Sequence, residues 1–541
     1  MPSRAELVFT NGLVWVAGTP PATTLAVGQG RILAVGDDDV RQTVGPGAQE
    51  VDLAGGMLLP GFVDAHVHPV QGGLERRACD LTGCADADEC VDAVARYAAS
   101  HPDVPWITGG GWQMAHFEGG TPTADLLDRV VDRPVFLPNR DHHGAWVNSR
   151  ALELAGIDAG TPDPADGRIE RDAGGRPTGT LHEGAMHLLE HLIPETTEDE
   201  HFAALLDAQA YLHSLGITGW QDAIVGAYAN MRDASAAYVR AVAEQRLTAR
   251  VVGALWWDRA RGLEQVPELL ARREQLTGGR FSATRVKIMQ DGVAENFTAG
   301  MTAPYLDACG HGTDNLGLSF VDPDALAESV CELDRHGFAV HVHAIGDRAV
   351  REALDAFQLA RRRNGSRNRH HIAHVQVIHP DDVPRFAELD LTATIQPLWA
   401  VHEPQMDELT VPFLGPLRST WQYPFAALER SGARLAGGSD WPVTSPDPLA
   451  GIHVAVNRVA PETPAMPPFL PEQRLALATA LLAYTAGSAY VNGDDDAGRL
   501  VVGARADLAV LDRDLFAHPV EEIAQARVLQ TYVGGELVFR V

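Results

Sequence analysis

The stretch RVKIMQDG at residues 285–292 is the point from which the rest of the chain can be interpreted. It contains Lys287, the only lysine in the sequence, so 42 of the 43 Lys and Arg side chains are arginines. Val286 to Met289 are otherwise apolar and predict a buried strand. An arginine is always charged, whereas a buried lysine has a lowered pKa and a reactive neutral amine. One role for such an amine is carbamylation, which gives an anion able to bridge two metal ions. A buried ion pair is the simpler alternative.

Composition is that of a large globular protein with more than one domain. The chain has 541 residues, of which 45% are hydrophobic. A formal net charge of −29 argues against nucleic acid or an anionic membrane as a partner. No apolar run is long enough to span a bilayer. The five cysteines are odd in number and include no C-x-x-C pair, so we expect reduced thiols and a cytoplasmic location.

Short apolar strands alternate with helical patterns through most of the chain. Helices are expected, for example, at Asp324–His336 and Arg348–Arg361. The strands are expected at 62–65, 217–220, 251–256, 286–289, 338–342, 371–373, 391–395 and 433–437. This count and alternation predict an α/β fold, a closed (β/α)₈ TIM-like barrel, in preference to an open sheet.

Both chain ends carry β patterns. Ala5–Val16 contains two short strands around an Asn-Gly turn, and the chain returns to β patterning after Gly498. We predict that residues 1–57 and 498–541 form one small β-sandwich domain beside a barrel domain of residues 58–497. The pattern between about 71 and 201 is irregular, which predicts an insertion after the first barrel strand that shapes a substrate pocket.

Ligand-type side chains recur at the ends of the predicted strands. His66 and His68 are two residues apart and point to the same side of a strand. The later strands carry Lys287, His343, His374 and Asp440. Active sites of such barrels lie at the carboxyl ends of the strands, and imidazoles with carboxylates suit zinc. Each histidine alone is equally explained as a core residue bonded to a carbonyl, but the shared phase on successive strands favours a metal centre.

The motifs then indicate a family. They are PGFVDAHVH (60–68), DHHGAWVNS (141–149), PTGTLHE (177–183), VKIMQDG (286–292), HAIGDRA (343–349), HIAHVQ (371–376) and GSDWPV (438–443). With these motifs the chain resembles the amidohydrolase superfamily over nearly its whole length. Within it the chain resembles the YtcJ-like branch, amidohydrolase family 3, which includes N-substituted formamide deformylases.

The resemblance implies a ligand set. Its metal ligands would be His66, His68, His343, His374 and Asp440, with a carbamylated Lys287 between two zinc ions. The number of metal ions stays open, and so does the choice between zinc and another divalent metal. His142 departs from the family pattern, which usually has a glycine there, and His143 then matches the branch's pocket histidine. Glu183 is a further candidate for approaching the metals, so the bridging role of Lys287 also stays open.

The implied activity is hydrolysis of an amide-type C–N bond, as in an N-substituted formamide, by a metal-activated hydroxide. Asp440 would act as general base and then acid, and His143 and the backbone around Trp112 are candidates for holding the carbonyl oxygen. Tryptophans 106, 112, 146, 399 and 441 predict an apolar substituent on a small-molecule substrate. We expect substrate contacts from Trp112, His143, Glu183, Asp291 and Gln396.

Three alternatives remain at this point. The first is deamination or ester hydrolysis on the same site. The second is a metal-dependent lyase, decarboxylase or isomerase. The third is a barrel that binds a ligand without catalysis. A homodimer is also left open.

Overall fold

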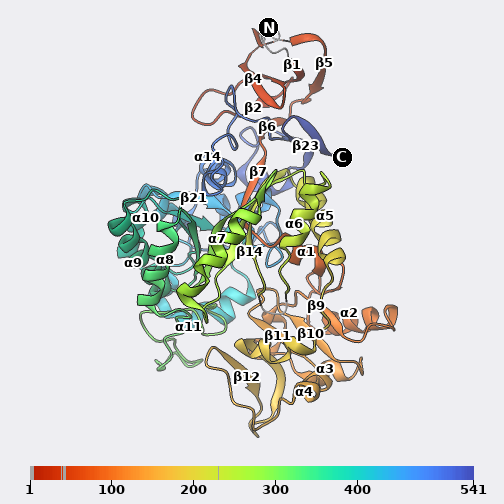
Figure 1. Cartoon of the computed structure of the whole chain (residues 1–541), viewed down its shortest axis with the longest axis vertical. Helices are drawn as coiled ribbons and strands as arrows, with labels where there is room; N and C mark the ends of the chain where they lie inside the picture. Colours follow the sequence, from red (N-terminus) through yellow and green to blue (C-terminus); the bar gives the residue numbers. More distant parts are fainter. Residues whose placement is uncertain (1–4, 38, 41–43, 229–230) are drawn as a thin grey trace.

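The computed structural model describes residues 5–37, 39–40, 44–228 and 231–541 (Figure 1). Its centre is a barrel in which eight parallel strands follow one another. They are β7 (Phe62–Val67), β14 (Ile217–Val225), β15 (Arg250–Trp256), β17 (Phe281–Met289), β18 (Ala339–Ala344), β19 (His371–His374), β20 (Thr392–Ile395) and β21 (Arg434–Gly437). All eight predicted barrel strands are therefore confirmed, and the two-residue β16 (Thr277–Gly278) extends β17 as a hairpin.

The first and last barrel strands meet just beyond their carboxyl ends. The backbone N–H of Asp440 donates to the carbonyl of His66 at 2.8 Å, and that of His68 donates to the carbonyl of Trp441 at 2.8 Å. The buried carboxylate of Asp64 on β7 accepts the hydroxyl of Ser439 at 2.6 Å. These bonds bring the loop after β21 against β7 at the rim where the candidate ligands lie.

Helices cover the barrel because each presents one apolar face to it. On α9 (Asp347–Asn364) the buried residues include Val350, Leu354 and Phe357, which recur at helical spacing. Two predicted helices are confirmed, as α9 and α8 (Pro323–Arg335). The other helices of this part are α5 (Glu198–Ser214), α6 (Ser235–Ala243), α7 (Val266–Gln275), α10 (Val383–Glu388), α11 (Val411–Ser419), α12 (Phe425–Arg430), α13 (Pro448–Asn457), α14 (Leu477–Leu482) and α15 (Ser488–Val491).

Strands from both chain ends form two further sheets. The first has the order β4 (Arg31–Gly36), β3 (Thr24–Gly28), β1 (Ala5–Thr10), β5 (Val44–Asp52). The second has the order β2 (Leu13–Val14), β6 (Met57–Pro60), β22 (Leu508–Leu511), β23 (Val528–Val533), β24 (Glu536–Arg540). One hydrophobic cluster joins Phe9, Leu58, Leu508 and Tyr532. The two chain ends thus fold together as expected, while the sandwich architecture and the domain boundaries stay predictions.

The segment after β7 is regular, although its sequence pattern is not. It contains a mixed sheet with the order β12 (Gly167–Arg171), β13 (Pro177–Glu183), β11 (Gly144–Val147), β10 (Val135–Pro138), β9 (Ile107–Gly110), β8 (Cys79–Asp80). Its helices are α1 (Pro69–Glu75), α2 (Ala87–Ser100), α3 (Ala124–Asp128) and α4 (Ser149–Ala155). Figure 1 shows this inserted sheet and the terminal sheets at opposite ends of the barrel.

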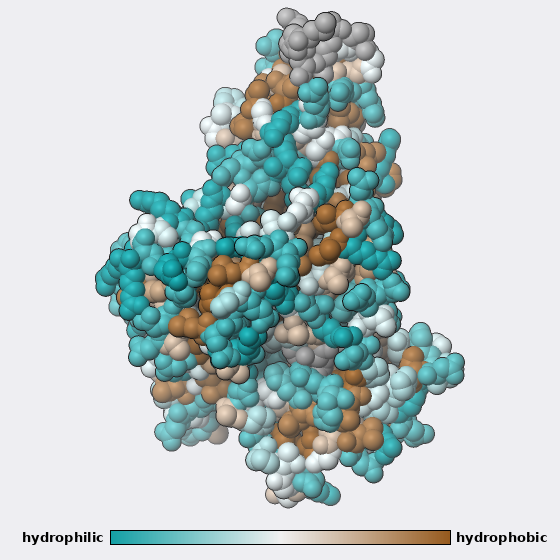
Figure 2. Space-filling view, viewed as in Figure 1, coloured by the Kyte–Doolittle hydropathy of each residue, from teal (hydrophilic) through white to brown (hydrophobic). Residues whose placement is uncertain are grey.

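The surface agrees with the acidic composition. Hydrophilic residues dominate the face seen in Figure 2, and hydrophobic ones appear in small separate areas. None of the helices in the described ranges combines the length and apolar character needed to cross a bilayer. All five cysteines are free thiols, as expected from their number and spacing.

Candidate metal centre

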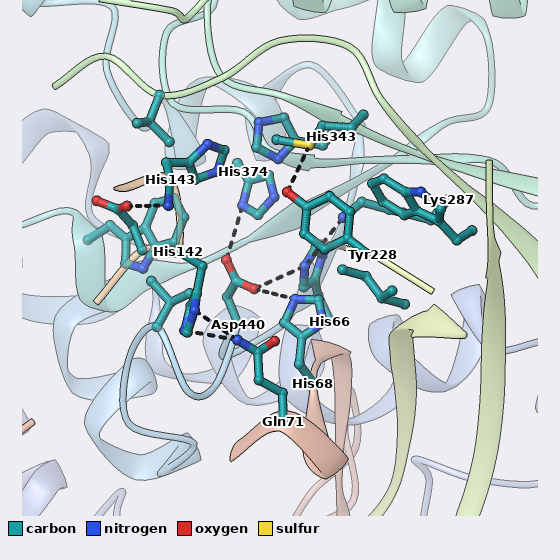
Figure 3. A pocket seen from close by; sticks show the side chains of 17 residues that line it. His66, His68, Gln71, His142, His143, Tyr228, Lys287, His343, His374 and Asp440 are labelled. Carbon is teal, nitrogen blue, oxygen red and sulfur yellow. Dashed lines mark hydrogen bonds and ion pairs between the residues drawn. The ribbon is translucent and has the colours of Figure 1, made fainter. Parts of the chain in front are cut away.

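A cavity of about 60 Å³ lies at the carboxyl ends of the barrel strands (Figure 3). Six predicted ligands line it together: His66, His68, Lys287, His343, His374 and Asp440. They come from β7, β17, β18, β19 and the segments directly after β7 and β21. The short strands end at one rim, so residues far apart in sequence meet there.

Asp440 is the centre of this group. Its Oδ1 lies 3.1 Å from Nε2 of His66 and 3.0 Å from Nε2 of His68. Its other oxygen, Oδ2, lies 3.7 Å from Nδ1 of His374. Imidazole nitrogens from three residues thus face one carboxylate. The side chains of His66, His374 and Asp440 are at least nine-tenths buried, and that of His68 is 12% exposed.

Lys287 points into the same group. Its Nζ lies 3.5 Å from Nε2 of His66, and the residue is 3% exposed. Burial lowers the pKa of the Lys287 amine to about 7, even though the nearby charge of Asp440 acts in the opposite direction. A substantial fraction of the amine is therefore neutral near neutral pH, which is the form that reacts with carbon dioxide.

The histidines are kept neutral by burial. Burial, and next the charge of Lys287, lowers the pKa of His66 to about 3. Burial also holds the pKa of His343 and of His374 well below the usual range. His343 and His374 lie with ring centroids 4.4 Å apart. Neutral imidazoles keep a lone pair for a metal ion.

The backbone is strained where these side chains turn into the cavity. Asp440 has φ 58°, His374 has φ 75°, and His142 and Glu183 on the inserted sheet have φ 64° and φ 50°. Residues other than glycine rarely adopt this left-handed region, and such strain gathers at functional sites. His374 is the last residue of β19 and Asp440 follows β21, so the strained backbone redirects each side chain at the end of a barrel strand.

Two histidines in the barrel interior support the ligand group. His341 Nε2 lies 2.9 Å from Nδ1 of His66, and His371 Nε2 lies 2.9 Å from the side-chain amide of Gln221. The rings of His341 and His371 are 4.2 Å apart. Sequence reasoning missed their supporting role, although the H-x-H and H-x-x-H patterns on β18 and β19 contain both. Such contacts fix the orientation of a ligand imidazole.

His143 forms a buried pair with Glu183. Its Nδ1 lies 3.0 Å from both carboxylate oxygens of Glu183, and Thr298 donates its hydroxyl to Glu183 at 2.7 Å. Burial alone would lower the pKa of His143, but the charge and hydrogen bond of Glu183 outweigh it and raise the pKa to about 9. His143 lines the cavity and is therefore a cationic donor beside it at neutral pH.

Not every predicted substrate contact lies in the cavity. Trp112 is fully buried in the inserted sheet, where its indole N–H donates to the carbonyl of Leu137 at 2.7 Å. The carboxylate of Asp291 accepts the backbone N–H groups of Ile345, Gly346 and Gly300.

Gln396 accepts the backbone N–H of His374 at 3.0 Å, and Glu183 lines a neighbouring cavity instead. Of the five predicted contacts, only His143 lines this cavity. Substrate contact by Trp112, Glu183, Asp291 and Gln396 stays a prediction.

Other walls of the cavity were not anticipated. Gln71, His142, Tyr228, Trp256 and Met289 also line it. Among the five tryptophans expected there, Trp399 lines it, and its ring is stacked on His374 with centroids 5.2 Å apart. No sequence motif indicated Tyr228 or Trp256 as wall residues. They line the cavity because β14 and β15 end side by side.

The donor set suits divalent metal ions. His66, His68 and Asp440 place one ligand atom each within 4.8 Å of one another. Nδ1 of His374 is buried, has no hydrogen-bond partner in the described part of the chain, and lies on the Asp440 side. Neutral imidazoles plus a carboxylate are ligands that zinc prefers. The residues present therefore fit the group that the sequence patterns predict.

Similarity to known proteins extends over nearly the whole chain. The chain is 30% identical to the putative amidohydrolase YtcJ of Bacillus subtilis, covering 91% of each protein. It is 27% identical to the N-substituted formamide deformylase of Arthrobacter pascens, covering 95% of this chain and 94% of that one. The crystal structure of an uncharacterised metal-dependent hydrolase from Pyrococcus furiosus superposes with a TM-score of 0.70 at 28% identity, covering 94% and 99%.

The family model described as "Amidohydrolase family" matches residues 49–539, which includes the barrel, the inserted sheet and the last strands. The predicted resemblance is thereby confirmed. The chain belongs to the amidohydrolase family.

Proposed function

We propose that this protein is a metal-dependent hydrolase that cleaves the amide-type C–N bond of a small N-substituted formamide or amide. The observation that carries the proposal is the convergence of a neutral lysine amine, imidazoles and one carboxylate in a single buried cavity. Similarity to a protein named N-substituted formamide deformylase supports the bond type.

The ligands would be divided between two zinc ions. His66, His68 and Asp440 form the tightest group, and His343 and His374, whose rings are 4.4 Å apart, line the same cavity. A carbamylated Lys287 would reach both ions. Bound zinc supplies polarisation of a carbonyl and a lowered pKa for water.

Protein groups have two further tasks in this reaction. Asp440 accepts a proton from the attacking water and passes it to the leaving nitrogen, which an amine needs in order to depart. The His143 imidazolium, held by Glu183, donates a hydrogen bond toward the carbonyl oxygen as negative charge develops there. Both side chains line the cavity, so each can reach a carbonyl group bound in it.

The cavity has room for a small acyl group. Its volume of about 60 Å³ can hold a formyl or acetyl group beside the candidate ligand residues. The nearby walls are mostly uncharged, with Tyr228, Trp256 and Trp399 among them. An apolar substituent on the nitrogen is consistent with these walls.

The test uses full-length protein purified with zinc. Its metal content is measured, and product formation is followed with N-benzylformamide, N-benzylacetamide, benzyl formate and N-formyl amino acids. We expect two zinc equivalents and equimolar benzylamine and formate from N-benzylformamide. Zinc-loaded protein that releases no amine from either amide would refute the proposal. A strong preference for the ester would indicate an esterase instead, and a strong preference for the N-formyl amino acids would indicate a carboxylate-bearing substrate.

A further inference from the structure

Three cavities of the described chain share the same two wall residues, His142 and Tyr228. The first is the cavity at the ligand residues. The second has a volume of about 290 Å³ and includes polar residues such as Glu190 and Arg259. The third has a volume of about 170 Å³. His142 and Tyr228 therefore stand where the metal-side cavity meets two outer ones.

The third cavity is largely apolar. Its apolar walls include Leu74, Ala78, Phe136, Pro138, Met186 and Ile193, and the polar Gln71, Glu75, Thr108, His142, Thr196 and Tyr228 also line it. The apolar residues belong to α1, its following loop, β10 and the segment after β13, so the insertion supplies most of the surface. An apolar cavity of about 150 Å³ is large enough to bind benzene in another protein. The cavity here can accordingly hold one phenyl ring or a short alkyl chain.

His142 is fixed between this cavity and the ligand residues. The side-chain amide of Gln71 lies 2.9 Å from its Nδ1, and Glu75 Oε1 lies 3.3 Å from its Nε2. Its side chain is 17% exposed. Gln71 also donates to Glu75 at 3.0 Å, so the three side chains form one cluster on the edge of α1 (Figure 3 shows Gln71 with His142).

The backbone of His142 is in a conformation that favours glycine. Its φ of 64° lies in the left-handed region, which costs a residue with a side chain of the order of 1 kcal/mol or more. The contacts with Gln71 and Glu75 offset that cost and hold the imidazole in the shared wall. A glycine here would keep the turn without strain and remove the wall.

We propose that the apolar cavity receives the substituent on the substrate nitrogen, and that His142 is the partition that limits which substituents reach it. This inference rests on the proposed hydrolysis of an N-substituted amide. Unbranched groups such as benzyl pass beside the imidazole, while a branch on the first carbon meets it. His142 thus determines specificity without taking part in bond cleavage.

The first experiment tests the cavity without catalysis. Benzyl alcohol, an uncharged probe, is titrated calorimetrically into wild-type protein, Ala78→Phe and Ala159→Phe. Ala78 lines the apolar cavity, whereas Ala159 lies on the exposed surface of the insertion, so the second variant is the matched control. We expect at least tenfold weaker binding for Ala78→Phe only. Equal binding by both variants would overturn the subsite.

The second experiment tests the partition. The kcat/KM values for N-benzylformamide and the branched N-(1-phenylethyl)formamide are compared in wild type, His142→Gly and His142→Ala. We expect the branched-to-unbranched ratio to rise at least tenfold in His142→Gly and less in His142→Ala, with zinc content unchanged. An unchanged ratio in His142→Gly would overturn the role of His142. Absence of hydrolysis by wild type would instead count against the proposed function, and the calorimetric result would still decide the subsite.

Discussion

Two basic residues on β17 show why the single lysine is special. Arg285 and Lys287 are two residues apart and both buried. The guanidinium of Arg285 donates to the carbonyl of Val491 at 3.0 Å and 2.7 Å, a use that any fixed cation could serve. The Lys287 amine instead faces His66 at 3.5 Å in the cavity wall. The proposed carbamylation would use the amine itself and not merely a positive charge.

Lys287→Arg is expected to fold but to lose at least one zinc equivalent and nearly all activity. A guanidinium stays protonated and cannot be carbamylated, so it repels metal ions from the cavity. Metal content is measured by mass spectrometry alongside thermal unfolding. Lys287→Ala should regain part of its activity with added short carboxylic acids. Full zinc and full turnover in Lys287→Arg would exclude the carbamate.

Asp440→Asn is expected to keep most of its zinc but to turn over about 10²–10⁴-fold more slowly, the range for loss of a general base. An amide oxygen can still face His66 and His68 but cannot carry the proton. Zinc content and kcat are measured on the same preparation. A variant that retains more than about a tenth of the rate would remove Asp440 from proton transfer.

The His143–Glu183 pair predicts a pH dependence of stability. Because the folded pKa of His143, about 9, lies above the unfolded value of 6.5, the pair's contribution is fully present below pH 6.5. It is lost as pH rises toward 9. We therefore expect the Tm difference between wild type and His143→Gln to shrink from pH 6.5 to 9.5.

The same pair predicts that kcat decreases at alkaline pH, which is the alkaline limb of the pH profile. In wild type the midpoint of this decrease should lie near pH 9, where His143 loses its proton. Glu183→Gln removes the charge that raises this pKa and should move the limb to lower pH. A limb at the same pH in both proteins would show that His143 does not act as the cationic donor.

At the scale of elements, the seam between β7 and the loop after β21 positions the ligands. Asp64 accepts the hydroxyl of Ser439 at 2.6 Å and its backbone N–H at 3.0 Å, and also the N–H of His66 at 3.0 Å. One carboxylate thus ties the residue before Asp440 to the strand that carries His66. The barrel closes here, and the metal-side geometry depends on the closure.

Ser439→Ala should destabilise the protein by about 1–3 kcal/mol, because the buried Asp64 loses a hydrogen-bond donor. Ser445→Ala, on the same loop but exposed, is the control and should change stability by less than about 0.5 kcal/mol. Denaturant unfolding measures both. We also expect weaker zinc retention in Ser439→Ala only. Equal stability of the two variants would show that the seam is held by the backbone bonds alone.

At the scale of the whole molecule, the two chain ends stabilise each other. Phe9 near the start and Tyr532 near the end contact edge to face, with ring centroids 5.2 Å apart in a shared cluster. The strand β6 of this region leads directly into β7. Loss of terminal packing is therefore expected to lower the stability of the whole fold.

Tyr532→Ala should cost about 3–5 kcal/mol, the range for removing a buried aromatic ring. Leu537→Ala on the neighbouring strand β24 is 47% exposed and should cost far less. Urea unfolding compares the two variants. Zinc bound per folded molecule should stay unchanged in both, because neither residue lies at the cavity. A small cost for Tyr532→Ala would mean that the terminal sheets contribute little to stability.

The sequence by itself determined the barrel and the position of the candidate ligand residues. Apolar strands and helical periodicity are local patterns, so all eight strands could be located from the order of the residues alone. Strand ends follow from the same patterns, and in a parallel barrel they share one rim. The placement of His66, Lys287 and Asp440 around one cavity could therefore be predicted.

Tertiary structure alone decided which of the remaining residues near the rim line the cavity. Periodicity gives the side of an element on which a residue lies, but not which backbone groups from other elements will meet it. Asp291 accepts three backbone N–H groups and does not line the cavity, and Trp112 is enclosed in the core of the inserted sheet. His142 of the insertion and Tyr228 from the segment after β14 both line the cavity, which is a long-range packing outcome that no local pattern contains.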